Sequence, residues 1–361
     1  MSKLGYGPRS STWLVMEPAE EEYFAVKVYT LAASDHANTV ELPILGRATH
    51  DLGVESPFLN KHFWEKTNNG RHLCVVSSPS SVTVRALLRE TGDRRVPVKV
   101  VQKVISTVAF ALSRLHKGDI MHGGIKSENI MLSPKPRADE LQAFLQEADA
   151  PTTVKIKKQF TVRSQPLPHD LIWEGKKDNV ISRHLYLVGY GHAQALPHKS
   201  EKDHDYYCAP ESLVYRAFCS SKTDIWMLGC LAFQLLIGAP PFYPGRAVPY
   251  NIVSMAVALG EETDTLRDDW YTYDTRMRKL AEVPPEPIRR NKAYVPAIES
   301  ALREVLNEDE VEGAISFIKA CLCLSPDKRI SAKDAWSHPW LSRANACMCG
   351  YYCKRETCGR H

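Results

Sequence analysis

The chain has 361 residues, of which 44% are hydrophobic and 24% are charged, and its formal net charge is +4. This composition indicates a folded core and excludes a largely disordered chain. The small net charge argues against nucleic acid or a membrane as the main partner. No apolar run approaches the ~20 residues that a membrane helix needs, and the N-terminus lacks the apolar core of a signal peptide, so we expect an intracellular protein of the cytoplasm or nucleus.

The first hundred residues are predicted to be rich in β-strands. Residues 12–15 and 23–29 carry β-branched and aromatic side chains around an acidic turn, and residues 72–76 form another apolar run. Residues 38–50 are predicted to form a short or kinked helix, because Pro43 interrupts the apolar pattern. The serine-rich stretch at 77–81 then breaks the last strand and predicts a linker.

The rest of the chain is predicted to be mainly helical. Apolar residues at helical spacing predict helices at 96–115, 223–238, 313–324 and within 325–341. The helix at 223–238 is apolar on nearly all sides, which predicts deep burial. Residues 133–183 are polar and aperiodic and are predicted to be an insertion, and residues 185–188 form a short apolar strand.

Several short motifs have both a structural and a functional interpretation. Gly5 and Gly7 lie between two predicted strands, where they favour a plain hairpin turn or a loop whose amides face a phosphate. Lys27 lies within an apolar strand and is either an exposed edge lysine or a ligand of nucleotide phosphates. Glu41, at the start of the apolar part of the next helix, is its candidate partner or a surface residue.

Two further motifs follow in the second part of the chain. Lys126 and Asn129 stand three residues apart in MHGGIKSENIML (121–132), beside a short apolar strand. Asp224 begins the buried helix, where helix capping alone would explain an aspartate. Glu211, in the stretch CAPE, is predicted to form an ion pair with Arg329.

Taken together, the order and spacing of these motifs resemble the eukaryotic protein-kinase family over residues 4–341. The closer likeness is to the SR-protein kinases and their fungal relatives, and it rests on LGYG, SxxWLV, HLCVV, SQPLP and DIWMLGC. The resemblance implies an α+β, bilobal protein-kinase fold with a small β-rich N-lobe and a large helical C-lobe. The expected kinase-like domain is 1–341, with the N-lobe at 1–78, the hinge at 77–81, the C-lobe at 82–341 and the insertion at 133–183.

The resemblance also implies roles for individual residues. The expected ATP-binding residues are Gly5 and Gly7 over the phosphates, Lys27 with its partner Glu41, Ala25 above the adenine, Met131 below it, and Ser80 as the hinge donor. His122 and Tyr190 correspond to positions that stabilise the assembled kinase core. Asp224 would hold the backbone of the catalytic loop.

The departures from the family fall on the chemistry. The catalytic aspartate, which accepts the proton of the substrate hydroxyl, corresponds to Gly124, and the loop arginine corresponds to Gly123. The metal-binding aspartate corresponds to Gly189. Of the catalytic and metal-binding set, Lys126 and Asn129 remain, and one neutral amide is a poor ligand for Mg²⁺.

The sequence therefore predicts a pseudokinase that acts by binding ATP, a protein partner, or both, without tight magnesium binding. Loss of a positioning carboxylate alone typically lowers a rate by ~10²–10⁴. The alternative is a weakly active serine/threonine kinase that transfers the γ-phosphate of ATP to a protein. That alternative would need a substitute carboxylate from Asp203, Asp205 or Glu128.

The C-terminal residues 342–361 are rich in cysteine and are predicted to be disordered. The alternative is a zinc site, because closely spaced thiolates can wrap Zn²⁺. The candidate ligands would be Cys347, Cys349, Cys353, Cys358 and His361.

Overall fold

The computed structural model describes residues 2–18, 22–55, 59–79, 82–90, 94–132, 138–147, 152–156, 159–165, 167, 184–196, 198–199, 208–213, 218–242, 248–261 and 297–342. The chain divides into two compact units. Unit 1 comprises Met1–Leu87 and Glu128–Gly191, and unit 2 comprises Leu88–Ser127 and His192–His361. The helix α3 (Val84–Glu90) contains the first division between them.

The main sheet of unit 1 contains the strands predicted near the N-terminus. Its described strands follow the order β1-β2-β3-β5-β4, and each neighbouring pair is antiparallel. Their bounds are β1 Ser2–Tyr6, β2 Ser10–Glu17, β3 Glu22–Tyr29, β4 Leu59–Thr67 and β5 Gly70–Ser77. Ala25 lies opposite Leu14 on one side and Ser77 on the other, and Lys27 lies opposite Val75.

A helical run between β3 and β4 packs against this sheet. It consists of α1 (Leu31–His36), η1 (Ala37–Glu41), α2 (Leu42–Gly46) and η2 (Arg47–Asp51). It is longer than the helix predicted at 38–50. The wider turn of η1 ends two residues before Pro43, whose missing N–H cannot continue a regular helix.

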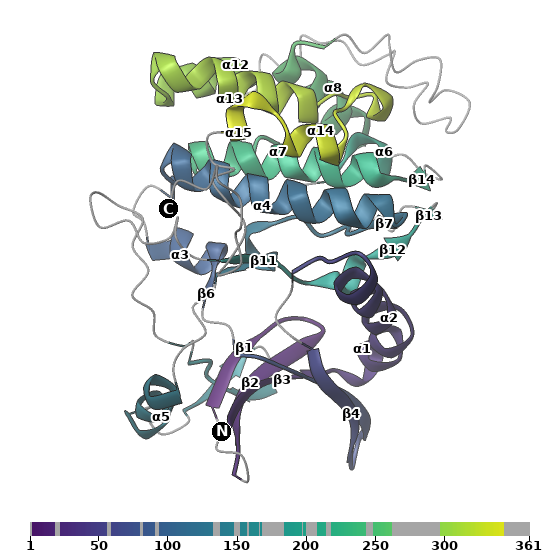
Figure 1. Ribbon diagram of the computed structural model, residues 1–361, viewed down its shortest axis with the longest axis vertical. Helices are drawn as coiled ribbons and strands as arrows, with labels where there is room; N and C mark the ends of the chain where they lie inside the picture. Colours follow the sequence, from purple (N-terminus) through teal and green to yellow (C-terminus); the bar gives the residue numbers. More distant parts are fainter. Residues whose placement is uncertain are drawn as a thin grey trace, which may run out of the picture. The chain divides into compact units, whose positions relative to one another are not determined.

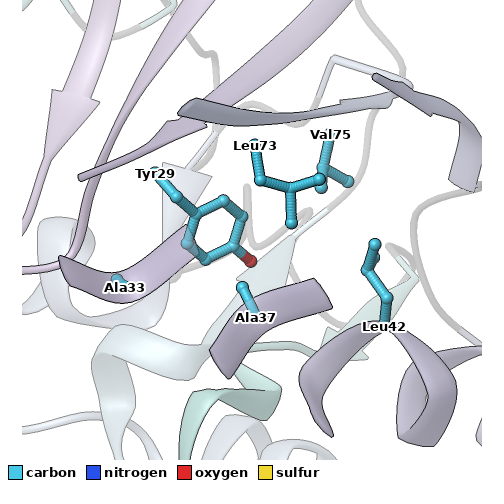
Figure 2. Close-up of a cluster of buried hydrophobic side chains, with 6 residues drawn as sticks. All are labelled: Tyr29, Ala33, Ala37, Leu42, Leu73 and Val75. Atoms are coloured by element: carbon cyan, nitrogen blue, oxygen red, sulfur yellow. The ribbon is translucent and has the colours of Figure 1, made fainter. Parts of the chain in front are cut away.

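The interface between this run and the sheet is apolar. Figure 2 shows strand residues facing helix residues, and the buried set is Tyr29, Leu73, Val75, Ala33, Ala37 and Leu42. Burial of the run on the sheet fixes the end of η1 close to β3.

Unit 1 also contains the residues on either side of the predicted insertion, and part of the insertion itself. Strands β6 (Val82–Thr83), β8 (Ile130–Leu132) and β11 (Leu185–Leu187) form a small sheet of order β11-β8-β6. Between β8 and β11 lie α5 (Ala138–Glu147), β9 (Thr153–Ile156) and β10 (Gln159–Val162). This pairing explains why residues 128–191 group with the N-terminal residues, although the sequence assigned them to the helical lobe.

Unit 2 is mainly helical, as predicted. Helices α4 (Val98–Lys117) and α7 (Ser221–Ile237) pack together, and α7 is buried along almost its whole length, with Trp226 fully enclosed. Figure 1 shows α13 (Glu308–Cys321), α14 (Ala332–Trp336) and α15 (Pro339–Ser342) beside them. The other described elements are β7 Ile120–Met121, η3 Ser127–Asn129, η5 Tyr190–His192, β12 Gln194–Ala195, β13 His198–Lys199, α6 Pro210–Leu213, β14 Phe218–Cys219, α8 Val248–Leu259, α12 Ile298–Val305, α13 Glu308–Cys321, η7 Pro326–Lys328, α14 Ala332–Trp336 and α15 Pro339–Ser342.

The start of α7 is capped by its own sequence. The Ser220 hydroxyl accepts a hydrogen bond from Lys222 N–H, and Thr223 completes a capping box with the Ser220 N–H. Gly238 ends the helix with φ of 84°, a left-handed conformation that glycine adopts without strain. The cap leaves Asp224 available for another role. None of the helices in the described part of the chain is both long and apolar enough to cross a membrane.

Candidate functional site

The ion pair predicted between Lys27 and Glu41 is present in unit 1. Lys27 Nζ lies 2.9 Å from Glu41 Oε1, and their side chains are 33% and 6% exposed. The packing of η1 on the sheet carries Glu41 into the interior, which excludes the surface reading of this residue. The Lys27 side chain keeps a third of its surface exposed, although it is paired with Glu41.

Two residues that the sequence reasoning missed complete the surroundings of Glu41. The Tyr29 hydroxyl donates a hydrogen bond to Glu41 Oε1 at 2.7 Å, and Lys27 Nζ lies 4.4 Å from the centre of the Tyr29 ring. Arg9, in the turn between β1 and β2, donates to the carbonyl of Gly191. Tyr29 lies two residues after Lys27 in one strand and hence on the same face, a signal that was readable, whereas nothing in the sequence shows that Arg9 turns inward.

The charges in this cluster fix its protonation states. Burial alone would raise the pKa of Glu41, but the attraction of Lys27, the hydrogen bonds from Lys27 and Tyr29 and the charge of Arg9 hold the pKa below its ordinary value. Burial, reinforced by the negative charge of Glu41, raises the pKa of Tyr29. Glu41 is therefore an anion and Tyr29 a neutral donor across the physiological range.

The glycines near this cluster differ in how much space a side chain would have. Gly7 is exposed and Gly5 is half-buried, and an added Cβ would meet nothing within 4 Å at either one. Gly7 N–H donates to Ser10 O at 2.8 Å, so the turn is a hairpin turn. At Gly191 an added Cβ would lie 2.9 Å from Arg9 Nη1, so the arginine packs directly on this backbone.

The expected adenine contacts are partly described. Ala25 in β3 is buried, and Met131 in β8 is half-buried and pairs with Thr83 and Tyr186. Ser80, the expected hinge donor, lies outside the described residues.

The loop after β7, in unit 2, is held by Asp224 as predicted. The carboxylate of Asp224 is fully buried and accepts the backbone N–H groups of His122 and Gly123, both at 2.8 Å. His116 Nε2 lies 3.0 Å from the same carboxylate. The N–H of Gly124 points to His122 Nδ1 at 3.2 Å, so the loop has a fixed backbone path through both glycines.

Gly123 occupies a position that suits glycine alone. Its φ is 69°, and an added Cβ would lie 2.6 Å from the backbone oxygen of His192. A side chain here would be strained and would push against backbone. The glycine that replaces the family's loop arginine is thus matched to its surroundings in this fold.

Gly189 and Asn129, which correspond to the family's metal-binding positions, lie next to each other within unit 1. Gly189 has a φ of 85°, and an added Cβ would lie 2.4 Å from Asn129 Oδ1, while Val188 N–H donates to Asn129 O at 2.8 Å. The Asn129 amide therefore fills the space that a residue 189 side chain would enter. Lys126, three residues before Asn129, is half-buried and belongs to unit 2.

The candidate substitute carboxylates are only partly placed. Glu128 Oε1 lies 3.7 Å from Arg85 Nε, and both side chains are substantially exposed. Asp203 and Asp205 lie outside the described residues, as does the cysteine-rich tail with its candidate zinc ligands. No group of three or more His, Cys, Asp or Glu side chains that could hold a metal occurs in the part of the chain that the structure describes.

The predicted Glu211–Arg329 pair is confirmed in unit 2. The guanidinium donates from Nη1 and Nη2 to the two carboxylate oxygens, each at 2.7 Å, and both residues are almost fully buried. Arg329 also donates to the carbonyls of Cys323 and Leu324, so hydrogen bonds compensate the burial of its guanidinium charge. This pair joins α6 to the segment before α14 and stabilises the helical unit.

Comparison with known proteins agrees with this fold. The protein kinase domain family matches residues 171–341. A serine/threonine-protein kinase SRPK of Physarum polycephalum is 23% identical over 95% of this chain and 85% of its own length. The protein kinase dsk1 of Schizosaccharomyces pombe is 29% identical over 45% of this chain. The mitogen-activated protein kinase mpkC of Emericella nidulans is 31% identical over 38% of this chain.

The matched regions often cover a minority of the relatives. The match spans 30% of the length of dsk1 and 30% of mpkC. A crystal structure of a kinase domain superposes with a TM-score of 0.59 at 15% identity, covering 94% of each chain, which shows the shared fold. The chain therefore has the protein-kinase fold and resembles the protein-kinase family, with kinases of the SR-protein type among its relatives.

Proposed function

We propose that this chain is a pseudokinase of the serine/threonine SR-protein-kinase type, which acts by binding ATP, a protein partner, or both. The observation that carries the proposal is the geometry at Gly189. The glycine backbone lies against the Asn129 amide, which takes the space that a metal-binding carboxylate would need. A neutral amide supplies no negative charge, whereas Mg²⁺ is a hard cation that carboxylates hold best.

The second support is the loop that carries Gly124. Its backbone is held by Asp224, so the loop keeps a fixed shape without a proton acceptor at position 124. In phosphoryl transfer the protein contributes positioning and charge neutralisation. This chain retains Lys27 with its Glu41 partner, which can attract phosphates, and lacks the carboxylates that would position the attacking hydroxyl and the metal.

The alternative of a weakly active kinase needs a replacement carboxylate. Glu128 is the described candidate, and its carboxylate faces Arg85. The positive charge of Arg85 partly neutralises the Glu128 carboxylate. This weakens Glu128 as a ligand for a metal and as an acceptor for the proton of a substrate hydroxyl. Binding of ATP or a protein partner is therefore proposed as the function, in preference to phosphate transfer.

Thermal shift and phosphate transfer together test the proposal. We expect ATP to raise the melting temperature equally with Mg²⁺ and with EDTA, and Lys27→Met to abolish the shift. The matched control is Lys66→Met, since Lys66 is an exposed lysine of the same sheet. Radiolabelled ATP should give no transfer above background to a serine-rich peptide. Robust Mg²⁺-dependent transfer that disappears in Lys27→Met would overturn the pseudokinase assignment.

Restoring the missing carboxylates tests how far the loss extends. The double variant Gly124→Asp with Gly189→Asp is expected to gain little transfer, because a side chain at 189 must first displace the Asn129 amide. A large gain of Mg²⁺-dependent transfer would show that the remaining site is intact and only two positions separate the chain from an active enzyme.

A further inference from the structure

Part of the insertion packs against the main sheet of unit 1. Leu141 of α5 and Leu167 form a buried cluster with Leu14 of β2, and their side chains are 4%, 3% and 0% exposed. Phe144 and Leu145 of α5 pack on the same cluster, together with strand residues. The residues that join them from the strands are Leu4 and Tyr23. The insertion thus supplies apolar side chains to the core of a unit that begins more than a hundred residues earlier.

The covered face is the one that carries Lys27. Leu14 lies directly opposite Ala25, so the two side chains share a face, and Lys27 follows two residues later on that same face. Same-face neighbours along a strand are about 7 Å apart. The insertion therefore covers Leu14, which lies beside Ala25 and so about 7 Å along the sheet from the level of Lys27.

The opposite direction along β3 is already occupied. Tyr29 is the next residue on that face, and it is buried under α1 and η1 (Figure 2). The other direction along β3 leads from Lys27 to Ala25 and Leu14, so a nucleotide whose phosphates contact Lys27 and whose base lies along this strand meets that surface. Ala25 is 6% exposed.

Polar contacts fasten the insertion along β1. Lys3 Nζ donates to Thr161 Oγ1 at 2.6 Å, and the N–H of Gln165 donates to Lys3 O at 2.7 Å. The Ser2 hydroxyl donates to Gln165 Oε1 at 2.9 Å. Lys3 and Ser2 are both buried and their partners are half-buried, so these bonds are partly shielded from water.

We propose that α5 and Leu167, which residues 161–165 fasten along β1, are an internal occupant of the nucleotide-binding face, and that an adenine nucleotide binds only when this insert segment is displaced. The inference rests on the proposed binding function and adds a way in which nucleotide binding is regulated. The apparent affinity for nucleotide is the intrinsic affinity multiplied by the fraction of molecules in which the segment is displaced. A partner that captures α5 would raise nucleotide affinity without touching Lys27.

The test compares nucleotide affinity in two matched variants of α5. Leu141→Asp places a charge in the buried cluster, whereas Gln142→Asp places the same charge at an exposed position of the same helix. Titration with a fluorescent ATP analogue in EDTA should show at least tenfold tighter binding to Leu141→Asp. Gln142→Asp should bind like the unmodified chain.

Hydrogen exchange decides the question even if Leu141→Asp fails to fold. Saturating nucleotide should accelerate amide exchange in α5 of the unmodified chain. Thr161→Val, which removes only the acceptor of the Lys3 bond, should bind a few times more tightly.

Unchanged α5 exchange on saturation would overturn the inference, and so would weaker or equal binding in a folded Leu141→Asp. Absence of nucleotide binding after α5 has been displaced would overturn it as well, while leaving partner binding as a function. Phosphate transfer, assayed separately, reports on the pseudokinase assignment alone.

Discussion

Replacement of Asp224 by alanine is the sharpest test of how the loop with the two glycines is held. The Asp224 carboxylate is fully buried and accepts two backbone N–H groups at 2.8 Å. Alanine leaves both donors buried without an acceptor, at about 1–3 kcal/mol each, so the expected loss is about 2–6 kcal/mol. That is a large part of the ~5–15 kcal/mol by which most domains are stable.

The assay is urea unfolding of the whole chain, followed by tryptophan fluorescence, to which Trp226, Trp336 and Trp340 of unit 2 contribute. A loss of about 4 kcal/mol with an m-value of about 2–3 kcal/mol/M lowers the midpoint by about 1.3–2 M. Asp224→Asn keeps one acceptor oxygen and should show roughly half the loss. Glu304→Ala, at an exposed site on α12, is the control and should leave the midpoint unchanged. A midpoint for Asp224→Ala within error of this control would refute the reasoning.

Three further predictions follow from the described contacts. Because the pKa of Glu41 is lowered in the fold, its stabilising contribution is full above the ordinary carboxyl pKa of ~4.3 and is lost as the pH falls through the lower folded value. Glu41→Gln should therefore be less stable at pH 7 and should lose less stability below about pH 4, and parallel pH profiles of the urea midpoint would contradict this. Gly123→Ala should lose at least ~1–2 kcal/mol from its left-handed backbone, whereas Gly5→Ala should lose no more than a few tenths, and equal midpoints would contradict the steric argument. Arg329→Met should lose about 3–5 kcal/mol by leaving the Glu211 carboxylate unpaired, and the double variant with Glu211→Leu should recover much of it; a stable single variant would count against a buried pair.

The pseudokinase proposal and the proposal that the insert segment blocks nucleotide binding are tested by different measurements. The first concerns the two glycines and Asn129, and it is decided by phosphate transfer. The second concerns the cluster of Leu14, Leu141 and Leu167, and it is decided by nucleotide affinity and by exchange of α5. A pseudokinase whose insert segment does not move remains consistent with the first proposal.

Local patterns in the sequence were sufficient for most of the elements. Alternating β-branched residues predicted β2, β3 and β5, and the run at 223–238 predicted a buried helix, because periodicity reflects which faces are covered. The spacing of the motifs also placed Lys27 with Glu41 and Glu211 with Arg329, and both pairs are present. Such pairs could be predicted because a buried charge needs a partner and few candidates occur at the right order along the chain.

The sequence by itself determined the fold class, the ion pairs and the absence of carboxylates at 124 and 189. Only the tertiary structure decided that Arg9 turns toward Gly191, that the Asn129 amide fills the space at Gly189, and that Leu141 and Leu167 cover the face of Lys27. The reason is physical: Leu141, Phe144 and Leu145 have the spacing of one helix face, but neither that spacing nor a turn says which distant surface it packs against. That choice is made by long-range packing, in which contacts between residues far apart in the chain outweigh local preference.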